Sequence, residues 1–368
     1  MDKSLAKGKA RVVWITNLPA PYRIPIWDRL SDLTNLQIFF LLKEENWRNW
    51  KIEFASNWSF KFLSKSSIRI SEYEFVFSPF GSKRVLSGAD VVIVGGWESP
   101  FYFFVYFNAR RNHIPIIQFY ESTMQSHRFN GPLIRYLRRR IFSLADHVVT
   151  AGAASTTAVL DMGINSSKIL TLFNPVDVCW FAEFAANYRV ETRSGHRFLY
   201  VGRLIDLKNV CSLIVAFASM RQTDDSLTIV GAGPLASDLM NQVSQVGLQD
   251  SIHFLGHHDQ KEVALDYASA DTLVLPSTNE VWGLVVNEAL ACGLHVVVSK
   301  AAGVAEFVAP MKGAFICEPT VIGLKEALIQ SRSEWEGVIP KPEVMEYTPE
   351  RFADALGGLL EKWKLRLK

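Results

Sequence analysis

Twelve short runs of β-branched and aromatic residues recur along the 368-residue chain, and most are separated by segments of helical length. Many of the runs are continuously apolar, which is typical of strands that helices cover on both faces. Strands that alternate with helices form parallel sheets with right-handed crossovers. The pattern therefore predicts an α/β fold with strands at 11–16, 36–42, 90–94, 114–119, 146–150, 169–173, 197–201, 227–230, 252–255, 271–275, 294–298 and 313–317.

The runs fall into two sets of six, and the break between the sets lies around Asn174 and the polar stretch 187–196. A chain of this length has room for two hydrophobic cores. We therefore expect two tandem Rossmann-like domains, residues 1–176 and 177–347, that face each other across a cleft at the carboxyl ends of their strands. Thr348 followed by a proline is a helix-start signal, so a last helix is expected over 348–368.

The charges are unevenly distributed along the chain, although its formal net charge is only +2. Residues 1–175 hold 22 Lys and Arg against 13 Asp and Glu, while residues 176–368 hold 17 against 24. The basic half suits nucleic acid, an anionic membrane surface or an acidic substrate. A difference that serves solubility alone is the alternative interpretation.

Several protein classes are excluded by what the sequence lacks. No apolar run approaches the ~18 residues that span a bilayer, and the N-terminal residues include no apolar signal core. The four cysteines, at 179, 211, 292 and 317, have no metal-ligand spacing and suit a reduced cytoplasm. We therefore expect a cytoplasmic protein rather than a secreted or membrane-spanning one.

Basic residues follow the first predicted strand of the second half. The strand 197–201 ends at Gly202 and Arg203, and Lys208 lies in the turn that opens the next helix. A guanidinium fork, an ammonium group and the free amides of a helix N-terminus together suit a diphosphate. The alternative is an ordinary surface Arg and Lys on a connecting loop.

Two glutamates flank a helix start after the predicted strand 271–275. Glu280 lies in a polar loop, and Glu288 lies in the second turn of a helix predicted over 285–291. The amides of Gly283, Leu284 and Val285 between them would face phosphate oxygens, while the carboxylates would accept hydrogen bonds from sugar or ribose hydroxyls. Two solvated glutamates on an amphipathic helix are the alternative.

The segment NEVWGLVVNEALACGLHVVVS, with its Glu-x7-Glu spacing, resembles the signature of the retaining nucleotide-sugar glycosyltransferases of family 4. The segments VGRLIDLKN, LTIVGAGPL, IHFLGHH and YASADTLVLPS resemble the same family in the same order. The resemblance is close over 198–308. Before residue 176 it is limited to 17–27, 145–152 and 172–177.

This resemblance implies a GT-B fold, with an N-terminal acceptor domain, a C-terminal donor domain and a last helix that crosses back to the first domain. It also implies residue roles in the donor domain. Arg203 and Lys208 would hold the diphosphate, Glu280 the donor sugar and Glu288 the ribose.

The first domain departs from the family pattern, because its members often carry a His at the end of a strand beside the reacting sugar. Here the strand 114–119 is followed by Tyr120 and Glu121. Either Glu121 or His127 could supply a hydrogen-bonding group near the anomeric carbon; a structural Glu121 is the alternative. Further acceptor or phosphate contacts are expected from Tyr22, Arg23 and Glu98, which lie in loops after predicted strands.

No resident cofactor is expected. Gly231, Gly233 and Ala236 fit a G-x-G-x-x-A dinucleotide fingerprint, but the acid expected at the end of the next strand is missing, so NAD is rejected. The chain has no Asp-x-Asp pair and no cluster of histidines, so no catalytic metal is expected. The nucleotide-sugar donor, of UDP or GDP type, is a substrate.

A basic amphipathic segment spans residues 128–140. Its arginines alternate with apolar residues at helical spacing, as in helices that lie on anionic lipid. Trp47, Trp50 and Trp58 lie in the same domain and suit a headgroup interface. The hypothesis is a peripheral membrane contact at the inner face; the alternative is that the apolar stripe and the tryptophans pack in the core. Nucleic acid is not expected, because no recognition motif accompanies the charge.

Together these features predict a retaining, metal-independent glycosyltransferase that moves a hexose from a nucleoside-diphosphate sugar to a hydroxyl of a glycan or lipid-linked acceptor, as in polysaccharide biosynthesis. Two alternatives stay open. One is a sugar epimerase or phosphorylase of the same fold, and the other is a degenerate subunit that binds the donor without turnover.

Overall fold

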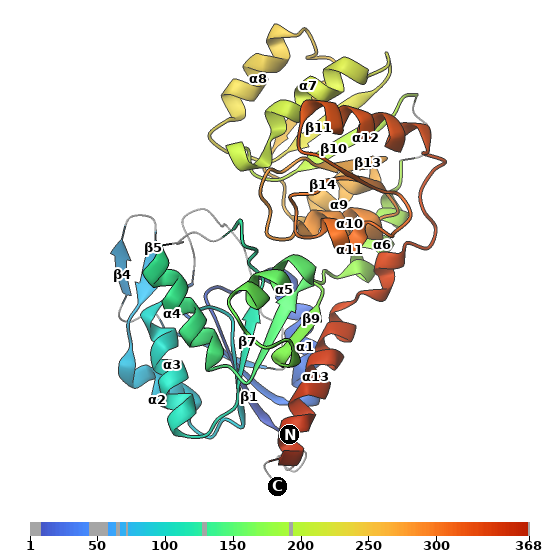
Figure 1. Cartoon of the computed structure of the whole chain (residues 1–368). Helices are drawn as coiled ribbons and strands as arrows, with labels where there is room; N and C mark the ends of the chain where they lie inside the picture. The colour runs from blue at the N-terminus through green and yellow to red at the C-terminus, as the bar shows by residue number, and fades with distance from the viewer. Residues whose placement is uncertain are drawn as a thin grey trace. The chain divides into compact units, whose positions relative to one another are not determined.

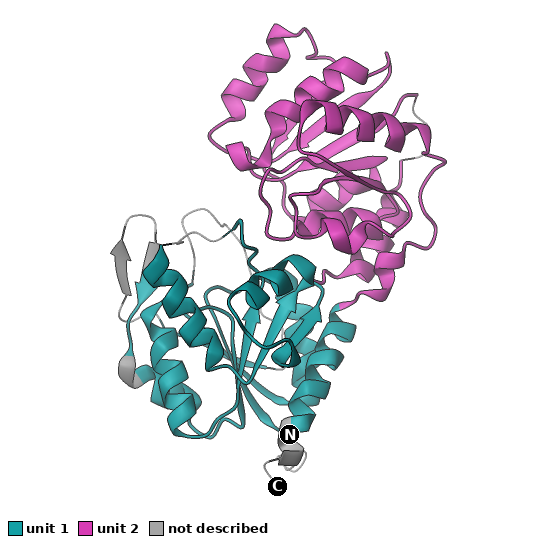
Figure 2. Cartoon of the chain, viewed as in Figure 1, with its two compact units in different colours: residues 1–173, 349–368 teal, residues 174–348 magenta. Residues whose placement is uncertain are grey.

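The computed structural model describes residues 9–43, 58–63, 67–70, 73–126, 131–190 and 194–366. The chain divides into two compact units (Figure 2). Unit 1 comprises residues 1–173 and 349–368, and unit 2 comprises residues 174–348. The predicted domain boundaries, after residues 176 and 347, lie within three residues of these positions.

Unit 1 contains a seven-stranded parallel sheet of strand order β3-β2-β1-β6-β7-β8-β9. Strand β6 is continuously apolar and fully buried, and β1 is buried from Val12 to Thr16, since helices cover both faces of the sheet. The strands are β1 (Arg11–Thr16), β2 (Asn35–Phe40), β3 (Ser59–Phe62), β6 (Val91–Val94), β7 (Ile116–Tyr120), β8 (His147–Ala151) and β9 (Ile169–Leu172).

The helices of unit 1 lie on opposite faces of this sheet (Figure 1). Helices α3, α4 and α5 connect strands that progress from β6 toward β9, whereas α1 connects β1 to β2 in the opposite direction, so right-handed crossovers place it on the other face. α13 packs against α1, and α2 packs against α3. The helices are α1 (Ile24–Leu33), α2 (Pro79–Leu86), α3 (Pro100–Arg111), α4 (Pro132–Ser143), α5 (Gly152–Asp161) and α13 (Pro349–Arg366), with short 3₁₀ turns η1 (Pro21–Arg23) and η2 (Ser166–Lys168).

The last helix returns to unit 1, as the resemblance implies. α13 begins at Pro349, directly after the predicted start signal. It approaches α1 closely at Gly357, where a Cβ atom would lie 3.0 Å from the side chain of Leu33. Phe352 is fully buried and meets Phe119 of β7 edge-on at 5.9 Å between ring centroids.

Unit 2 contains a six-stranded parallel sheet of order β12-β11-β10-β13-β14-β15, which has the six predicted strands. They are β10 (Arg197–Val201), β11 (Ser226–Val230), β12 (Ile252–Gly256), β13 (Thr272–Leu275), β14 (His295–Ser299) and β15 (Ala314–Cys317). The connecting elements are α6 (Val178–Tyr188), η3 (Asp206–Lys208), α7 (Val210–Met220), α8 (Ala236–Gln245), α9 (Gln260–Ala268), α10 (Leu284–Ala291), α11 (Ala305–Val308), α12 (Val321–Ser333) and η4 (Glu343–Glu346).

Three strands of unit 1 were not predicted. β3 lies at the edge of the large sheet, and its residues alternate between exposed and half-buried rather than forming a continuous apolar run. The other two, β4 (Ser67–Ile70) and β5 (Tyr73–Val76), form a separate antiparallel hairpin. Edge strands and isolated hairpins lack the two covered faces on which the prediction relied.

Trp58 is a core residue, so the prediction that it faces a membrane is wrong. Its side chain is buried, its indole N–H donates to Asp28 Oδ1 at 2.7 Å, and its ring meets Trp27 edge-on at 5.3 Å between centroids. Edge-on contacts of buried aromatic rings stabilise a core. Trp47 and Trp50 lie outside the described residues.

Within the described part of the chain, no helix has both the length and the apolar composition needed to cross a bilayer.

Candidate functional site

The loops after β10 and β11 approach each other backbone to backbone. The amide of Gly202 donates to the carbonyl of Val230 at 3.0 Å. Gly231 has a φ of +144°, and a Cβ atom there would lie 1.8 Å from the Gly202 carbonyl oxygen. Only glycine fits such a close approach of two backbones. The two loops therefore pack backbone against backbone at the carboxyl end of the sheet.

Lys208 and Glu280, which the sequence analysis placed in separate loops, form an ion pair. Lys208 ends the 3₁₀ turn after β10, and Glu280 lies in the loop after β13. The amide of Thr278 donates to the carbonyl of Leu207 at 2.9 Å and joins the two loops. Both charged side chains are partly exposed, at 16% for Lys208 and 17% for Glu280, so the pair borders solvent.

Asn209 fastens three loops together, a role that the sequence analysis missed. Its backbone is left-handed, with a φ of +55°, a conformation that asparagine tolerates better than most residues. Its side-chain amide donates to the carbonyls of Pro276 at 3.1 Å and Pro319 at 2.9 Å. The loops after β10, β13 and β15 are therefore held at one edge of the sheet.

The backbone of Glu280 is fixed from the other side by the loop after β14. Glu280 forms a parallel bridge with Ala302, and the amide of Gly303 donates to the Glu280 carbonyl at 3.0 Å. A Cβ atom on Gly303 would lie 2.1 Å from the carbonyl oxygen of Val281. This packing restricts where the carboxylate of Glu280 can lie.

The helix α10 begins at Leu284, one residue earlier than predicted. Its N-cap is Gly283, whose φ is +105° and which provides no side-chain cap for the first amides. The turn favours glycine because of this φ, and a Cβ atom there would also lie 2.5 Å from the end of the Leu275 side chain. An uncapped helix N-terminus with its positive dipole end is suited to an anion such as a phosphate.

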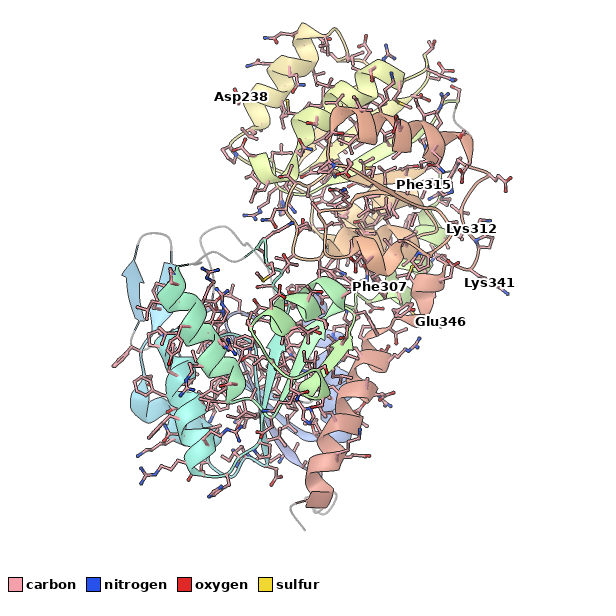
Figure 3. All side chains as sticks on the ribbon, in the orientation of Figure 1. Asp238, Phe307, Lys312, Phe315, Lys341 and Glu346 are labelled. Carbon is pink, nitrogen blue, oxygen red and sulfur yellow. The ribbon has the colours of Figure 1, made fainter. Side chains whose placement is uncertain are left out.

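Trp282, two residues before α10, packs against the start of this helix. Its indole N–H donates to Asn287 Oδ1 at 3.2 Å, and the Asn287 amide donates to the carbonyl of Asn174 at 3.1 Å. The ring of Phe307, which is labelled in Figure 3, packs against Trp282 at 5.4 Å and against Tyr347 at 4.7 Å between ring centroids. These contacts fix the direction of α10.

Glu288 lies half-buried in the second turn of α10. Tyr267, a fully buried residue of α9, donates a hydrogen bond from its hydroxyl to Glu288 Oε2 at 2.8 Å. Burial raises the pKa of Glu288 to about 7, although the Tyr267 hydrogen bond acts in the opposite direction. The carboxyl group therefore titrates near neutral pH. No sequence signal pointed to Tyr267, because it comes from a separate helix.

Arg203 presents its side chain at the surface. Its carbonyl accepts a hydrogen bond of 2.8 Å from the buried hydroxyl of Tyr200, which holds the backbone of the turn in place. The guanidinium is exposed, so the structure places it at the loop edge without fixing it to Lys208.

In unit 1, Arg23 and Glu121 form an ion pair between the turn after β1 and the residue after β7. Arg23 is only 6% exposed, and its Nη1 donates to Thr16 Oγ1 at 3.3 Å. Burial lowers the pKa of Arg23, but the charges and hydrogen bonds of Glu121 and Tyr22 together outweigh burial, so the pKa is raised overall. The carbonyl of Glu121 accepts a hydrogen bond of 2.7 Å from Ser155.

Of the other predicted residues of unit 1, Tyr22 lies beside this pair. Tyr22 is half-buried, with its ring centroid 5.7 Å from the Arg23 guanidinium carbon. Glu98 is exposed, and its charge raises the pKa of Tyr120 together with the larger effect of burial. His127 lies outside the described residues.

Arg138 is buried, which contradicts its predicted place on a lipid-facing surface. It is 2% exposed, and its guanidinium carbon lies 4.5 Å from the centroid of the Trp97 ring. A guanidinium over an indole face gains a cation–π attraction that is stronger away from water. Burial lowers the pKa of Arg138.

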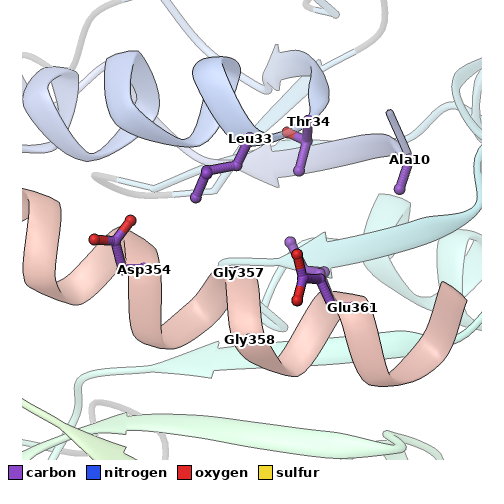
Figure 4. Close-up of a pocket in the computed structure, with 8 residues that line it drawn as sticks. Ala10, Leu33, Thr34, Asp354, Gly357, Gly358 and Glu361 are labelled. Atoms are coloured by element: carbon purple, nitrogen blue, oxygen red, sulfur yellow. The ribbon is translucent and has the colours of Figure 1, made fainter. Parts of the chain in front are cut away.

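A pocket of about 230 Å³ lies elsewhere in unit 1, between the end of α1 and the middle of α13 (Figure 4). Asp354 and Glu361 of α13 and Thr34 beside α1 line it, with Gly357 and Gly358 at its floor. None of the predicted site residues lines this pocket. Among the residues that the structure describes, no group of three or more His, Cys, Asp or Glu is arranged to hold a metal ion.

Residues 190–341 match the family model for glycosyl transferases group 1. The chain is 30% identical over 234 residues to a glycogen synthase of Mycobacterium tuberculosis, covering 58% of this chain and 56% of the relative. It is 37% identical over 101 residues to an alpha-monoglucosyldiacylglycerol synthase of Streptococcus pneumoniae, covering 27% of this chain and 23% of the relative. The chain therefore spans about half the length of the first relative, and less of the second.

Two solved structures resemble almost the whole chain. Alr3699/HepE of Anabaena, in complex with UDP, has a TM-score of 0.68 at 14% identity, covering 95% of this chain and 100% of the other. Sucrose-phosphate synthase of Thermosynechococcus elongatus has a TM-score of 0.70 at 17% identity, covering 97% and 100%. These likenesses concern the fold, and they confirm the predicted class of two parallel α/β domains seen in GT-B glycosyltransferases.

Proposed function

We propose that the protein is a retaining, metal-independent glycosyltransferase that transfers a hexose from a nucleoside-diphosphate sugar to a hydroxyl of a glycan or lipid-linked acceptor. The observation that carries the proposal is the ion pair of Lys208 with Glu280 beside the uncapped start of α10, inside the segment that matches the glycosyl transferase family model. Cationic, anionic and amide groups are thus fastened together at one edge of the unit 2 sheet.

The diphosphate of the donor would be held by cationic side chains and amides. An ammonium group has three N–H donors, so Lys208 can keep its bond to Glu280 and still donate to a phosphate oxygen. Arg203 at the loop edge and the first amides of α10, at Leu284 and Val285, supply further donors. As the bond between the anomeric carbon and the diphosphate breaks, these groups would stabilise the negative charge of the departing diphosphate without a metal ion. Each such donor lowers the activation free energy by ~3 kcal/mol in comparable sites.

The two glutamates would bind the hydroxyls of the donor. A carboxylate accepts up to about four hydrogen bonds, so Glu280 retains capacity for sugar hydroxyls beside its bond to Lys208. Glu288, in the second turn of α10, would accept hydrogen bonds from the ribose on one carboxylate oxygen. Tyr267 holds the other oxygen in place. Gly202 and Gly283 would let the backbone approach the nucleotide closely.

The acceptor side of the proposal rests on unit 1. Glu121 would hydrogen-bond near the anomeric carbon, and Arg23 would orient it through the buried ion pair. Tyr22 and Glu98 would contact the acceptor, whose hydroxyl attacks on the face that the diphosphate leaves. The similarity to a glucosyldiacylglycerol synthase supports a lipid acceptor and with it the predicted anionic membrane partner.

The donor nucleotide is proposed to be UDP, with GDP as the second candidate, because a structure of the same fold was solved with UDP. A cytoplasmic location is part of the proposal. It is supported by Cys211, an exposed thiol of the kind that a reducing compartment maintains.

Calorimetric titration with UDP, GDP and NAD tests the donor site. We expect one diphosphate to bind the wild type and to bind Glu288→Ala more weakly, with Glu318→Ala as a control at an exposed carboxylate of the same unit. Binding of NAD, or the absence of any diphosphate binding, would contradict the proposal. Turnover of the nucleotide sugar to an epimer without acceptor would indicate the epimerase instead, and donor binding without any turnover would indicate a degenerate subunit.

A further inference from the structure

The helix α4 has an unusual distribution of side chains around its axis. Its inward face buries Arg138 and Phe142, and the arginine lies over the Trp97 ring. Its outward face carries the apolar residues Leu133 and Tyr136, which are 68% and 59% exposed. Leu137, on the same outward stripe, is also exposed. Ile141 and Phe142 of α4 lie in the core of unit 1, so the exposed residues form a second apolar stripe, which points away from that core.

Arginines surround this apolar stripe. Arg135, Arg139 and Arg140 are all exposed, and they lie one to three positions from Tyr136 or Leu137 along the helix. A helix surface that combines exposed apolar side chains with flanking cations is typical of helices that lie in the headgroup region of a bilayer.

The neighbouring helix α3 repeats the pattern. Phe103 and Phe107, one turn apart, are exposed at 37% and 62%, and exposed Arg110 and Arg111 follow on the same side at the helix end. Arg110 links α3 to the end of α4 by donating to the carbonyl of Leu144. Aromatic side chains next to arginines on two linked helices thus belong to one side of unit 1.

The helix α2 extends the charge of this side. It packs against α3, and its Lys83 and Arg84 are exposed. Together α2, α3 and α4 contain eight Lys and Arg and no Asp or Glu, although Arg138 is buried and Arg110 pairs with Asp146 just after α4. On the opposite face of the same sheet, α1 and α13 together contain five basic and five acidic residues. The excess of positive charge is therefore specific to the face of the sheet that carries α2, α3 and α4, and Figure 1 shows where these helices lie.

We propose that the outward surface of α2, α3 and α4, which we call the basic–aromatic face, docks on an anionic lipid bilayer. Lipid phosphates would pair with the cations, while Leu133, Tyr136, Phe103 and Phe107 would enter the boundary between headgroups and acyl chains. A nucleic acid or an acidic protein surface would satisfy the cations but would leave such exposed apolar side chains without apolar partners. The observations come from unit 1 alone and do not depend on the transferase reaction.

This face differs from the contact that the sequence predicts over residues 128–140. It loses Arg138, which is buried, and it gains α2 and α3. The bilayer contact therefore involves three helices rather than one.

Flotation of the full chain with vesicles tests the proposal. The vesicles contain phosphatidylcholine alone, or phosphatidylcholine and phosphatidylglycerol in equal parts. We expect binding to the anionic vesicles, weakened by salt because the charges are exposed. Removing the three flanking arginines should weaken binding about a hundredfold, at about fivefold for each charge near an anionic surface. That variant combines Arg135→Gln, Arg139→Gln and Arg140→Gln.

Two apolar variants test the other half of the face. Serine substitutions should also weaken vesicle binding, in the pair Phe103→Ser with Phe107→Ser and in the triple variant Leu133→Ser with Tyr136→Ser and Leu137→Ser. The matched control is Ile322→Ser with Ile329→Ser, two exposed apolar residues on α12 of unit 2, which should bind like the wild type. Thermal unfolding shows whether each variant is folded. If an apolar variant is not folded, the arginine variant alone tests the proposal.

Three results would overturn the proposal. The first is a wild type that does not float with anionic vesicles. The second is unchanged binding in the arginine variant or in both apolar variants. The third is a protein that binds heparin but not vesicles, and whose heparin binding persists in the triple serine variant. This result would identify a polyanion site in place of a lipid surface.

Discussion

The hydroxyl of Tyr267 in α9 donates to the carboxylate of Glu288 in α10 at 2.8 Å, and the two residues lie 21 positions apart in the chain. Tyr267 is fully buried and Glu288 is half-buried, so the tyrosine holds one carboxylate oxygen from the protein interior. Burial also raises the pKa of Glu288 to about 7. Glu288, which we propose to bind the ribose, is therefore oriented by Tyr267 and titrates close to neutral pH.

Nucleotide binding should depend on this titration. The ionised carboxylate accepts hydrogen bonds from ribose hydroxyls, so affinity should rise as the pH rises through about 7 and level off above it, with up to a tenfold change per pH unit below the pKa. Calorimetric titration of UDP across this range checks the slope. Glu288→Gln should bind more weakly and without that slope, and a wild-type profile that is flat around neutral pH would contradict the assignment.

The free energy of unfolding of unit 2 should also depend on the titration of Glu288, in a direction that its raised pKa determines. Because the folded pKa of Glu288 is raised above the unfolded value, the stability it contributes is fully present below the unfolded pKa of about 4.5 and is lost as the pH rises through about 7. The change is on the order of 3 kcal/mol. Glu288→Gln lacks it, so the stability of the variant relative to the wild type should increase with pH.

Urea denaturation at several pH values measures this difference. Comparison with the variant at each pH is needed because His196, whose pKa burial lowers to about 4, acts in the opposite direction. Its stability contribution is present above an unfolded pKa of about 6.5 and is lost as the pH falls through about 4. A difference between variant and wild type that stays constant with pH would show that folding does not raise the pKa of Glu288.

Lys208→Ala should weaken diphosphate binding about ten- to a hundredfold, because it removes a charged hydrogen-bond donor and leaves Glu280 without its cation. The measurement is calorimetric titration with UDP. Lys300→Ala provides a matched control, since Lys300 and Glu318 form an exposed Lys–Glu pair in the same unit. Equal effects of the two substitutions would argue against a specific site at Lys208.

Gly231→Ala should disrupt the packing of the loops after β10 and β11 in unit 2. Its φ of +144° disfavours any side chain, and the Cβ atom would meet the Gly202 carbonyl at 1.8 Å, so we expect a loss of about 3 kcal/mol in stability together with weaker UDP binding. Gly247→Ala isolates the effect of backbone conformation alone, because Gly247 has a φ of +66° and open space around it. The control should lose only about 1 kcal/mol and bind UDP normally.

Arg23→Met should destabilise unit 1 by about 3 kcal/mol, because it removes the cation that forms an ion pair with the largely buried Glu121 carboxylate. Urea denaturation checks this. Adding Glu121→Leu should recover much of the loss, since the variant then no longer buries a carboxylate in the absence of the Arg23 cation. Arg29→Ala, which breaks an exposed pair with Asp354, should cost under about 1 kcal/mol. A similar loss in both single variants would show that Arg23 and Glu121 gain little from their pairing.

The sequence by itself determined the two parallel sheets and the elements that carry the candidate site. Continuous apolar runs occur because buried parallel strands contact helices on both faces, and this burial is visible in each run by itself. Parallel topology then places the carboxyl ends of the strands at one edge, which is why Lys208 and Glu280 could be expected near each other. The edge strand β3 and the hairpin of β4 and β5 escaped because they lack two covered faces.

Only the tertiary structure decided which side chains meet. The pairing of Arg23 with Glu121, and of Tyr267 with Glu288, joins residues of separate elements, and helical or strand periodicity carries no information about such partners. In α4 the sequence contains more apolar positions than one buried face can hold. Contact with the sheet and with Trp97 selects the face that includes Arg138, and Leu133 is left exposed. Periodicity predicts that a helix has faces, but the packing of its neighbours determines which of them is buried.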